Sequence, residues 1–207
     1  FKTFKDKRLK YFRSKSYQKL YQARNKAIKK CKGQYITFID TDDWWLKTKL
    51  KKQVYTLKKH KDYKIIYSNW FVYNEIKKTK KIFNSIGLPF GEISQQLLNN
   101  YELNIGTMML KRDLFAKYNF NVSYEIIGDF DLFIRLSLKY KFYAIQEPLA
   151  YYRVHKNNFS RNANLYAYEL NKWINKNRNK LTNKNIDIKN QKIYLLKLKL
   201  KSFLNLN

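Results

Sequence analysis

The first regular feature of the chain is an apolar stripe over residues 16–32. Its members recur every three or four positions, as on one face of a helix: Tyr17, Leu20, Tyr21, Ala27, Ile28 and Cys31. We expect Gly33 to end this helix, because glycine tolerates the backbone conformation of a helix C-terminus. The next run, residues 35–39, is short, β-branched and aromatic, which predicts a buried strand ending at Asp40.

The alternation of helix and strand continues downstream. Leu46, Leu50, Val54 and Leu57 predict a second helix, and residues 64–67 predict a second strand. This order favours an α/β domain with a mixed, mostly parallel sheet flanked by helices. Further elements are expected in this order: a hairpin over 70–83, a short helix over 93–98, a strand over 107–110, a helix over 129–140, and a strand over 142–145 that Pro148 interrupts.

The composition changes after about residue 160, where asparagine and lysine dominate. The last stretch, residues 193–206, alternates leucine and lysine, and this pattern suits a strand edge or a basic amphipathic segment equally well. We therefore divide the chain into a domain over residues 1–160 and a basic C-terminal appendage, helical or irregular, over residues 161–207.

The net charge is +29, from 44 basic and 15 acidic residues. Such a charge suggests nucleic acid or an anionic membrane as partner. However, 36 of the basic residues are lysines and eight are arginines, the residue suited to planar phosphate and base recognition. We therefore interpret most of the charge as compositional background. One cysteine excludes an internal disulfide, and no stretch approaches the ~18 apolar residues of a membrane-spanning helix.

The strongest local signal is Asp40-Thr41-Asp42-Asp43, directly after the first predicted strand. Ligands of open α/β sheets bind beyond the carboxyl ends of strands. Three carboxylates within four residues repel one another, and a divalent cation that also binds a diphosphate would neutralise them. The alternative is an acidic N-terminal cap on the following helix.

Several segments in order resemble the family-2 glycosyltransferases, which are inverting enzymes with the GT-A fold. Ala23-Arg24-Asn25 precedes the Asp40–Asp43 run, and Trp45, Lys49, Leu50 and Gln53 follow it as in the family. Residues 128–136 are similar to the segment with the family's catalytic base, and residues 147–155 to its closing Pro-Leu…Tyr-Arg-x-His stretch. The resemblance covers residues 8–160 and implies a GT-A domain for residues 1–160.

The resemblance implies a sugar transfer from a nucleotide-diphosphate sugar to a glycan or lipid-linked acceptor, with inversion. Asp129 would be the general base, and Asp42, Asp40 and His155 would hold Mn²⁺ or Mg²⁺. Arg24, Asp40, Arg153 and His155 would bind the donor nucleotide or its diphosphate. Such an enzyme would belong to polysaccharide or cell-envelope synthesis, and we expect it in the cytoplasm, with the tail on the anionic inner face of the membrane.

Each of these assignments has a structural alternative. Asp129 could cap the 129–140 helix, and Arg24 could pair with a carboxylate of the Asp40–Asp43 run. Arg153 could likewise bind a carboxylate, and His155 could be a loop residue without a ligand. On the acceptor side we place Trp45, Gly106 and Thr107 as weak candidates. Trp45, with its neighbour Trp44, could equally be a core anchor.

The chain departs from the family pattern in two places. Gly128 stands where family members usually carry an acid before the base, and Glu125 is the nearest substitute in sequence. The family's opening strand and its Asp-Asp-Gly-Ser-like turn are also missing, so we expect an N-terminally truncated domain with weak donor binding, or a catalytically impaired remnant. The competing hypothesis is a nucleic-acid-binding protein; we expect no specific nucleic acid, provided that Asp40 and Asp129 share one cleft.

Overall fold

The computed structural model describes residues 5–156, 158–159 and 162–204. Its helices are α1 (Leu20–Lys30), α2 (Lys49–Lys59), α3 (Ser94–Asn99), α4 (Gly128–Ser137), α5 (Ala163–Thr182) and α6 (Lys189–Phe203). Its strands are β1 (Tyr35–Thr37), β2 (Trp44–Trp45), β3 (Ile65–Asn74), β4 (Thr79–Ile82), β5 (Met109–Lys111) and β6 (Phe142–Val154). Two short 3₁₀ turns, η1 (Ile105–Thr107) and η2 (Arg112–Ala116), flank β5. The predicted α/β class and mixed sheet are confirmed.

The strands form one sheet in the order β1-β5-β3-β6-β2, with β4 on β3. The expected predominance of parallel pairing is wrong, because β3–β6 is the one parallel ladder among the described strands. Strand β5 is antiparallel to both β1 and β3 and lies between them. It therefore separates two strands that run in the same direction.

Strand β6 continues through Pro148, where the sequence predicted a break. Proline has no amide hydrogen for a ladder, so strands accept it at irregular positions. The β3–β6 register shifts on both sides of Asn69, the residue paired with Pro148. The resulting bulge extends β6 to Val154, and the segment that contains Arg153 thereby reaches the end of the sheet where β1 also ends.

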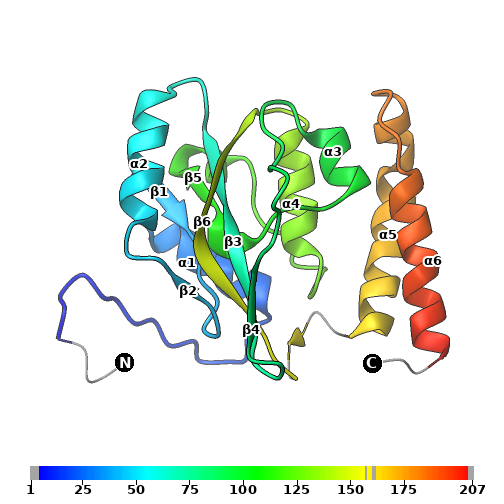
Figure 1. Ribbon diagram of the computed structural model, residues 1–207, viewed down its shortest axis with the longest axis horizontal. Coiled ribbons are helices and arrows are strands. Elements are labelled where there is room, and N and C mark those ends of the chain that lie inside the picture. The colour runs from blue at the N-terminus through cyan, green and yellow to red at the C-terminus, as the bar shows by residue number, and fades with distance from the viewer. Residues whose placement is uncertain (1–4, 157, 160–161, 205–207) are drawn as a thin grey trace.

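Helices cover both faces of the sheet (Figure 1). Helix α2 packs on one face, where Leu57, Ile66 and Met109 form a small buried cluster. The larger core lies on the other face, beneath α1, α3 and α4. Helices α5 and α6 form a pair outside α4, and Trp173 of α5 packs against Phe130 at 4.8 Å between ring centres. The C-terminal segment left open by the sequence is thus helical and adds to this core.

Candidate functional site

One open cleft of about 830 Å³ contains the acids of both predicted segments. Its lining includes Asp40, Asp42 and Asp43 after β1, and Asp129 at the start of α4. These segments are 89 residues apart in the sequence (129 − 40), so tertiary structure alone brings them together. The condition set by the sequence for a transferase-like site is met.

The acidic run sits in a tight turn between two short strands. The Asp43 amide donates to the Asp40 carbonyl at 3.2 Å, and the two tryptophans that follow form β2 against β6. The indole of Trp44 stacks on Tyr151 at 4.7 Å between ring centres. Pairing on both sides of the turn therefore holds three carboxylates at the floor of the cleft.

Arg24 of α1 forms an ion pair with Asp40. The Arg24 side chain is 11% exposed and lies over Phe120, with the guanidinium carbon 5.8 Å from the ring centre. The carboxylate pairing considered from the sequence is therefore present. Both residues also line the cleft, so the guanidinium remains next to the space that a ligand would occupy. Its neighbour Asn25 points away and holds the backbone of Phe120.

His155 meets Asp42 across the mouth of the turn, with 2.8 Å between Nε2 and Oδ2. The loop after β6 fixes the histidine, because its backbone amide donates to Asn158 Oδ1 at 2.6 Å. The Asn158 amide in turn donates to the Arg153 carbonyl at 3.1 Å. The distant Tyr-Arg-x-His segment thus folds back onto the acidic run.

Asp43 is held by the backbone of the segment that folds back over the acidic run. Its Oδ1 accepts from the backbone amide of Arg153 at 2.9 Å. Burial raises the pKa of Asp43 to about 7, and the charges of Asp42 and Asp40 add to the increase. The Arg153 side chain lies 3.6 Å from Glu75, between Nη1 and Oε1. The backbone of Arg153 thus serves the acidic turn, whereas its guanidinium contacts another carboxylate.

Asp42 and His155 fit a divalent cation as a pair of protein ligands. Carboxylate oxygen and imidazole nitrogen are both ligands that Mn²⁺ accepts, with water or phosphate oxygen at the other positions. No group of three His, Cys, Asp or Glu side chains in residues 5–156, 158–159 and 162–204 is arranged to hold a metal. A cation here would therefore depend on oxygens of a bound ligand, as a diphosphate supplies.

Asp129 is held by a partner that the sequence did not identify. The Tyr21 hydroxyl lies 3.3 Å from Asp129 Oδ1 and 2.7 Å from the Ile126 carbonyl. A side chain at Gly128 would overlap the Tyr21 ring, so glycine is needed there for the ring to reach Asp129. Glu125, the substitute considered from the sequence, instead pairs with Lys19 at 2.6 Å. The Tyr21 ring therefore fills the space beside Gly128, the position at which the resemblance led us to expect an acid.

Burial raises the pKa of Asp129, and the amide of Phe130 and the charge of Arg24 offset part of the increase. The Phe130 amide donates to Asp129 Oδ1 at 2.8 Å, a bond between sequence neighbours, whereas the N-cap of α4 is Ile127 and has no side-chain cap bond. Asp129 therefore does not form the helix cap considered from the sequence. It lies in the first turn of α4, where the helix dipole favours an acid, and it lines the cleft.

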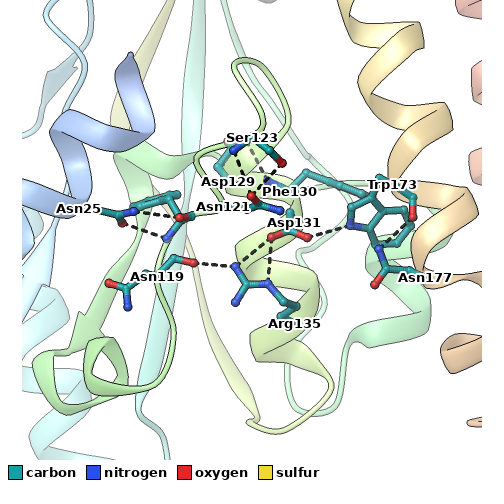
Figure 2. A network of polar contacts seen from close by, with 11 residues as sticks. Asn25, Asn119, Asn121, Ser123, Asp129, Phe130, Asp131, Arg135, Trp173 and Asn177 are labelled. Carbon is teal, nitrogen blue, oxygen red and sulfur yellow. Dashed lines mark hydrogen bonds and ion pairs between the residues drawn. The ribbon is translucent and has the colours of Figure 1, made fainter. Parts of the chain in front are cut away.

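The start of α4 is anchored by two buried acids outside the cleft. Asp131 accepts from Trp173 Nε1 at 3.1 Å and from Arg135 Nε at 2.9 Å, joining α4 to α5 (Figure 2). Glu169 of α5 accepts from three successive backbone amides, those of residues 125, 126 and 127, at 2.6–3.1 Å. No sequence signal marked Glu169. Together these acids fix the backbone that carries Asp129.

Trp45, Gly106 and Thr107 lie behind the cleft and are not among its lining residues. The Trp45 indole donates to the Gly106 carbonyl at 2.7 Å, and Gln53 donates to the Thr107 carbonyl at 2.6 Å. The buried Lys49 amine bonds Gln53 Oε1 at 2.8 Å and lies 4.3 Å from the centre of the Trp45 ring. This arrangement corresponds to the core-anchor alternative for Trp45.

The remaining cleft wall is rich in aromatic residues. Trp70 and Phe83 stack at 3.9 Å between ring centres, and both line the cleft. Tyr101 lies on the same wall, and its buried hydroxyl has no hydrogen-bond partner among the described residues. Phe83 is 38% exposed, whereas Trp70 behind it is 4% exposed.

Comparison with known proteins gives consistent matches. An uncharacterized glycosyltransferase of Methanocaldococcus jannaschii is 28% identical over 179 residues, 83% of this chain and 62% of that protein. A UDP-Glc:α-D-GlcNAc-diphosphoundecaprenol β-1,3-glucosyltransferase of Escherichia coli, WfaP, is 28% identical over 68% of this chain and 53% of its own length. The chain therefore spans less than two thirds of these relatives.

The fold matches a solved structure. The crystal structure of Staphylococcus aureus TarS residues 1–349 aligns with a TM-score of 0.52 and 14% identity, over 87% of this chain and 59% of that one. TarS in complex with UDP-GlcNAc aligns with a TM-score of 0.50 over 73% of this chain. The family profile described as "Glycosyl transferase family 2" matches residues 1–119, more than half of the chain. The chain belongs to glycosyl transferase family 2.

Proposed function

We propose that this chain carries the catalytic site of an inverting glycosyltransferase that moves a sugar from a nucleotide-diphosphate sugar to a glycan or lipid-linked acceptor. The observation that supports this most directly is the single cleft shared by the Asp40–Asp43 run and Asp129. In this proposal the Asp40–Asp43 run binds a cation and diphosphate, and Asp129 binds an acceptor hydroxyl. A nucleic-acid groove would exclude such carboxylates from its floor.

Asp129 acts as the general base in this proposal. It accepts the proton of the acceptor hydroxyl as that oxygen attacks the anomeric carbon, and the bond from that carbon to the diphosphate oxygen breaks on the opposite side. Single in-line displacement inverts the configuration. The raised pKa of Asp129 suits a base that must hold a proton after the transfer. Tyr21 acts as a positioning residue through its hydroxyl.

Asp42 and His155 would hold the divalent cation, Mn²⁺ or Mg²⁺, with Asp40 beside them. When bound, such an ion supplies Lewis-acid stabilisation of the departing diphosphate. Arg24 is oriented by Asp40 and offers its remaining N–H groups to the donor nucleotide or diphosphate. Arg153 supports the site through its backbone bond to Asp43.

The acceptor side lies along the aromatic wall. Phe83, which is 38% exposed and stacks on the buried Trp70, provides a flat apolar surface for a sugar ring. Phe83 replaces Trp45, Gly106 and Thr107 as the acceptor contact that we propose. A lipid-linked acceptor is supported by the diphosphoundecaprenol substrate in the printed name of WfaP.

The test is a screen of nucleotide sugars for transfer and donor hydrolysis with Mn²⁺ or Mg²⁺. Asp129→Asn should keep donor binding and lose turnover by about 10²–10⁴-fold, the usual contribution of a general base. Asp62→Asn, an exposed acid outside the cleft, is the matched control and should keep full turnover. Turnover that survives in Asp129→Asn would refute the assignment of the base.

A further inference from the structure

Helix α6 has two apolar faces. Its core-facing side chains are Gln191, Leu195 and Leu198, all buried. A second set lies on the opposite side at steps of three, four and three residues, with exposed fractions of 41%, 60%, 61% and 85%: Ile193, Leu196, Leu200 and Phe203, here called the outer stripe. Residues at this spacing share one helix face, so the outer stripe is a continuous apolar surface.

Lysines border the outer stripe on both sides. At 100° per residue, Lys192 and Lys199 lie along one edge and Lys197 and Lys201 along the other. The helix KNQKIYLLKLKLKSF contains no acidic residue. An apolar strip between two cationic edges is complementary to a surface that is apolar inside and negatively charged outside.

The helix is held rigidly by the rest of the molecule. Gln191 donates to the Leu98 carbonyl of α3 at 2.9 Å, and Tyr194 meets Tyr166 of α5 at 5.6 Å between ring centres. Figure 1 shows α6, in red, as the outermost helix on the side away from the sheet. The outer stripe is therefore preformed, and little conformational entropy is lost when it binds a partner.

We propose that the outer stripe of α6 binds the surface of an anionic lipid bilayer. The stripe spans 10 residues, or about 15 Å of helix, whereas a stable protein interface uses roughly 20–30 residues on each side. A second copy would bring lysine-bordered stripes of equal charge together. Interfacial helices use this pattern of lysine flanks around leucine and phenylalanine. The choice of a bilayer over an acidic protein also rests on the lipid-linked acceptor of the proposed function.

Sedimentation with phosphatidylcholine vesicles, with and without phosphatidylglycerol, tests the apolar part. The chain should bind the anionic vesicles, and Leu196→Ser/Leu200→Ser should weaken binding at least tenfold. Both leucines are exposed, so the fold should tolerate the change. Ile86→Ser/Phe90→Ser, with exposed fractions of 99% and 67%, is the matched control and should bind like the unchanged chain.

A second pair of variants tests the charged edges. Lys192→Gln/Lys199→Gln should weaken binding to anionic vesicles by about 25-fold, since a lysine near such a surface contributes about a factor of five. Lys77→Gln/Lys81→Gln removes the same charge from the exposed β3–β4 hairpin and should have little effect. An equal loss in both pairs, or no binding by the unchanged chain, would overturn the proposal.

Two further measurements complete the test. Sedimentation equilibrium without lipid tests whether the outer stripe binds a second copy of the chain. We expect no self-association through the stripe. Self-association of the unchanged chain that Leu196→Ser/Leu200→Ser abolishes would reject the bilayer as the occupant. Donor hydrolysis should be equal in the α6 variants and the unchanged chain. Vesicle binding without donor turnover would refute the proposed function and keep the bilayer assignment of the outer stripe. Donor turnover without vesicle binding would refute the bilayer assignment and keep the proposed function.

Discussion

The segment from Asp40 to Gln53 has acids on its cleft side and a buried lysine on its opposite side, and burial shifts the pKa of these groups in opposite directions. On the cleft side, burial raises the pKa of Asp43 to about 7 beside two other carboxylates. On the opposite side, burial lowers the pKa of Lys49 to about 7, with hydrogen bonds to neutral partners and an aromatic ring nearby. The acids leave negative charge that a ligand can neutralise, whereas the Lys49 amine is bound by Thr37 and Gln53 within the protein. We therefore assign ligand chemistry to the acids and support of the fold to the lysine network.

The largest effect is expected on cation binding when an acid of the cleft side is removed. Asp42→Ala removes one of two protein ligands, and we expect Mn²⁺ affinity to fall by about 100-fold or more, the upper range for disturbing a metal site. Stability without cation should change little, because the loss of a carboxylate that repels its neighbours offsets the loss of the His155 contact. Calorimetric titration and thermal unfolding in EDTA measure both. Unchanged Mn²⁺ affinity would remove Asp42 from the site.

Lys49→Met should lower stability and leave cation binding unchanged. The change leaves Gln53 Oε1 without its donor in a buried place, and we expect unfolding free energy to fall by about 2–3 kcal/mol. Lys51→Met, at an exposed position on the same helix, is the control. Denaturant titration measures both variants. A loss of stability in the control as large as in Lys49→Met would contradict the special role of Lys49.

The lowered pKa of Lys49 also predicts how stability depends on pH. The folded state binds fewer protons than the unfolded state between pH 7 and the ordinary lysine value of 10.5. Stability from this group therefore increases as pH rises through that window. The difference between the unchanged chain and Lys49→Met should widen from pH 7 to pH 9.

A smaller effect is expected from Tyr21→Phe, which removes the hydroxyl shared between the Ile126 carbonyl at 2.7 Å and Asp129 Oδ1 at 3.3 Å. We expect kcat to fall about tenfold, since a hydrogen bond to a charged group contributes roughly 1.5 kcal/mol. Loss of a donor to the carboxylate should also raise the pKa of Asp129, so the acid limb of the pH–rate profile should move to higher pH. A lower rate with an unmoved limb would indicate a purely structural role.

The smallest effect is predicted for Asp43→Asn, which keeps an oxygen acceptor for the Arg153 amide and removes the charge. The folded state holds the Asp43 proton up to about pH 7, so the native carboxyl reduces stability as pH rises from about 4 to 7. Asp43→Asn should raise the unfolding temperature by about 2–4 °C at pH 8 and leave it unchanged at pH 4. A uniform shift at every pH would contradict this account.

The site was predictable where acidic and histidine residues, which are few in this chain, occur in short motifs. The acidic run, the Asp129 segment and the Tyr-Arg-x-His stretch are each local, and the structure brings Asp40, Asp42, Asp43 and Asp129 to one cleft, with His155 on Asp42. Trp45, Gly106 and Thr107, the expected acceptor contacts, do not line this cleft, and a one-dimensional pattern does not say which side of a turn faces it. Their bonds to the lysine network appear only in three dimensions.

The sequence by itself determined the helices before residue 160, most strands and the chemical nature of the site, because periodicity and carboxylate spacing are local properties. Tertiary structure alone decided the antiparallel insertion of β5, the passage of β6 through Pro148, and the Tyr21 contact that Gly128 permits. It also decided that the leucine–lysine tail is a helix with a second apolar face. Each of these depends on a partner more than 70 residues away or on packing against α3 and α5, and no local pattern carries that information.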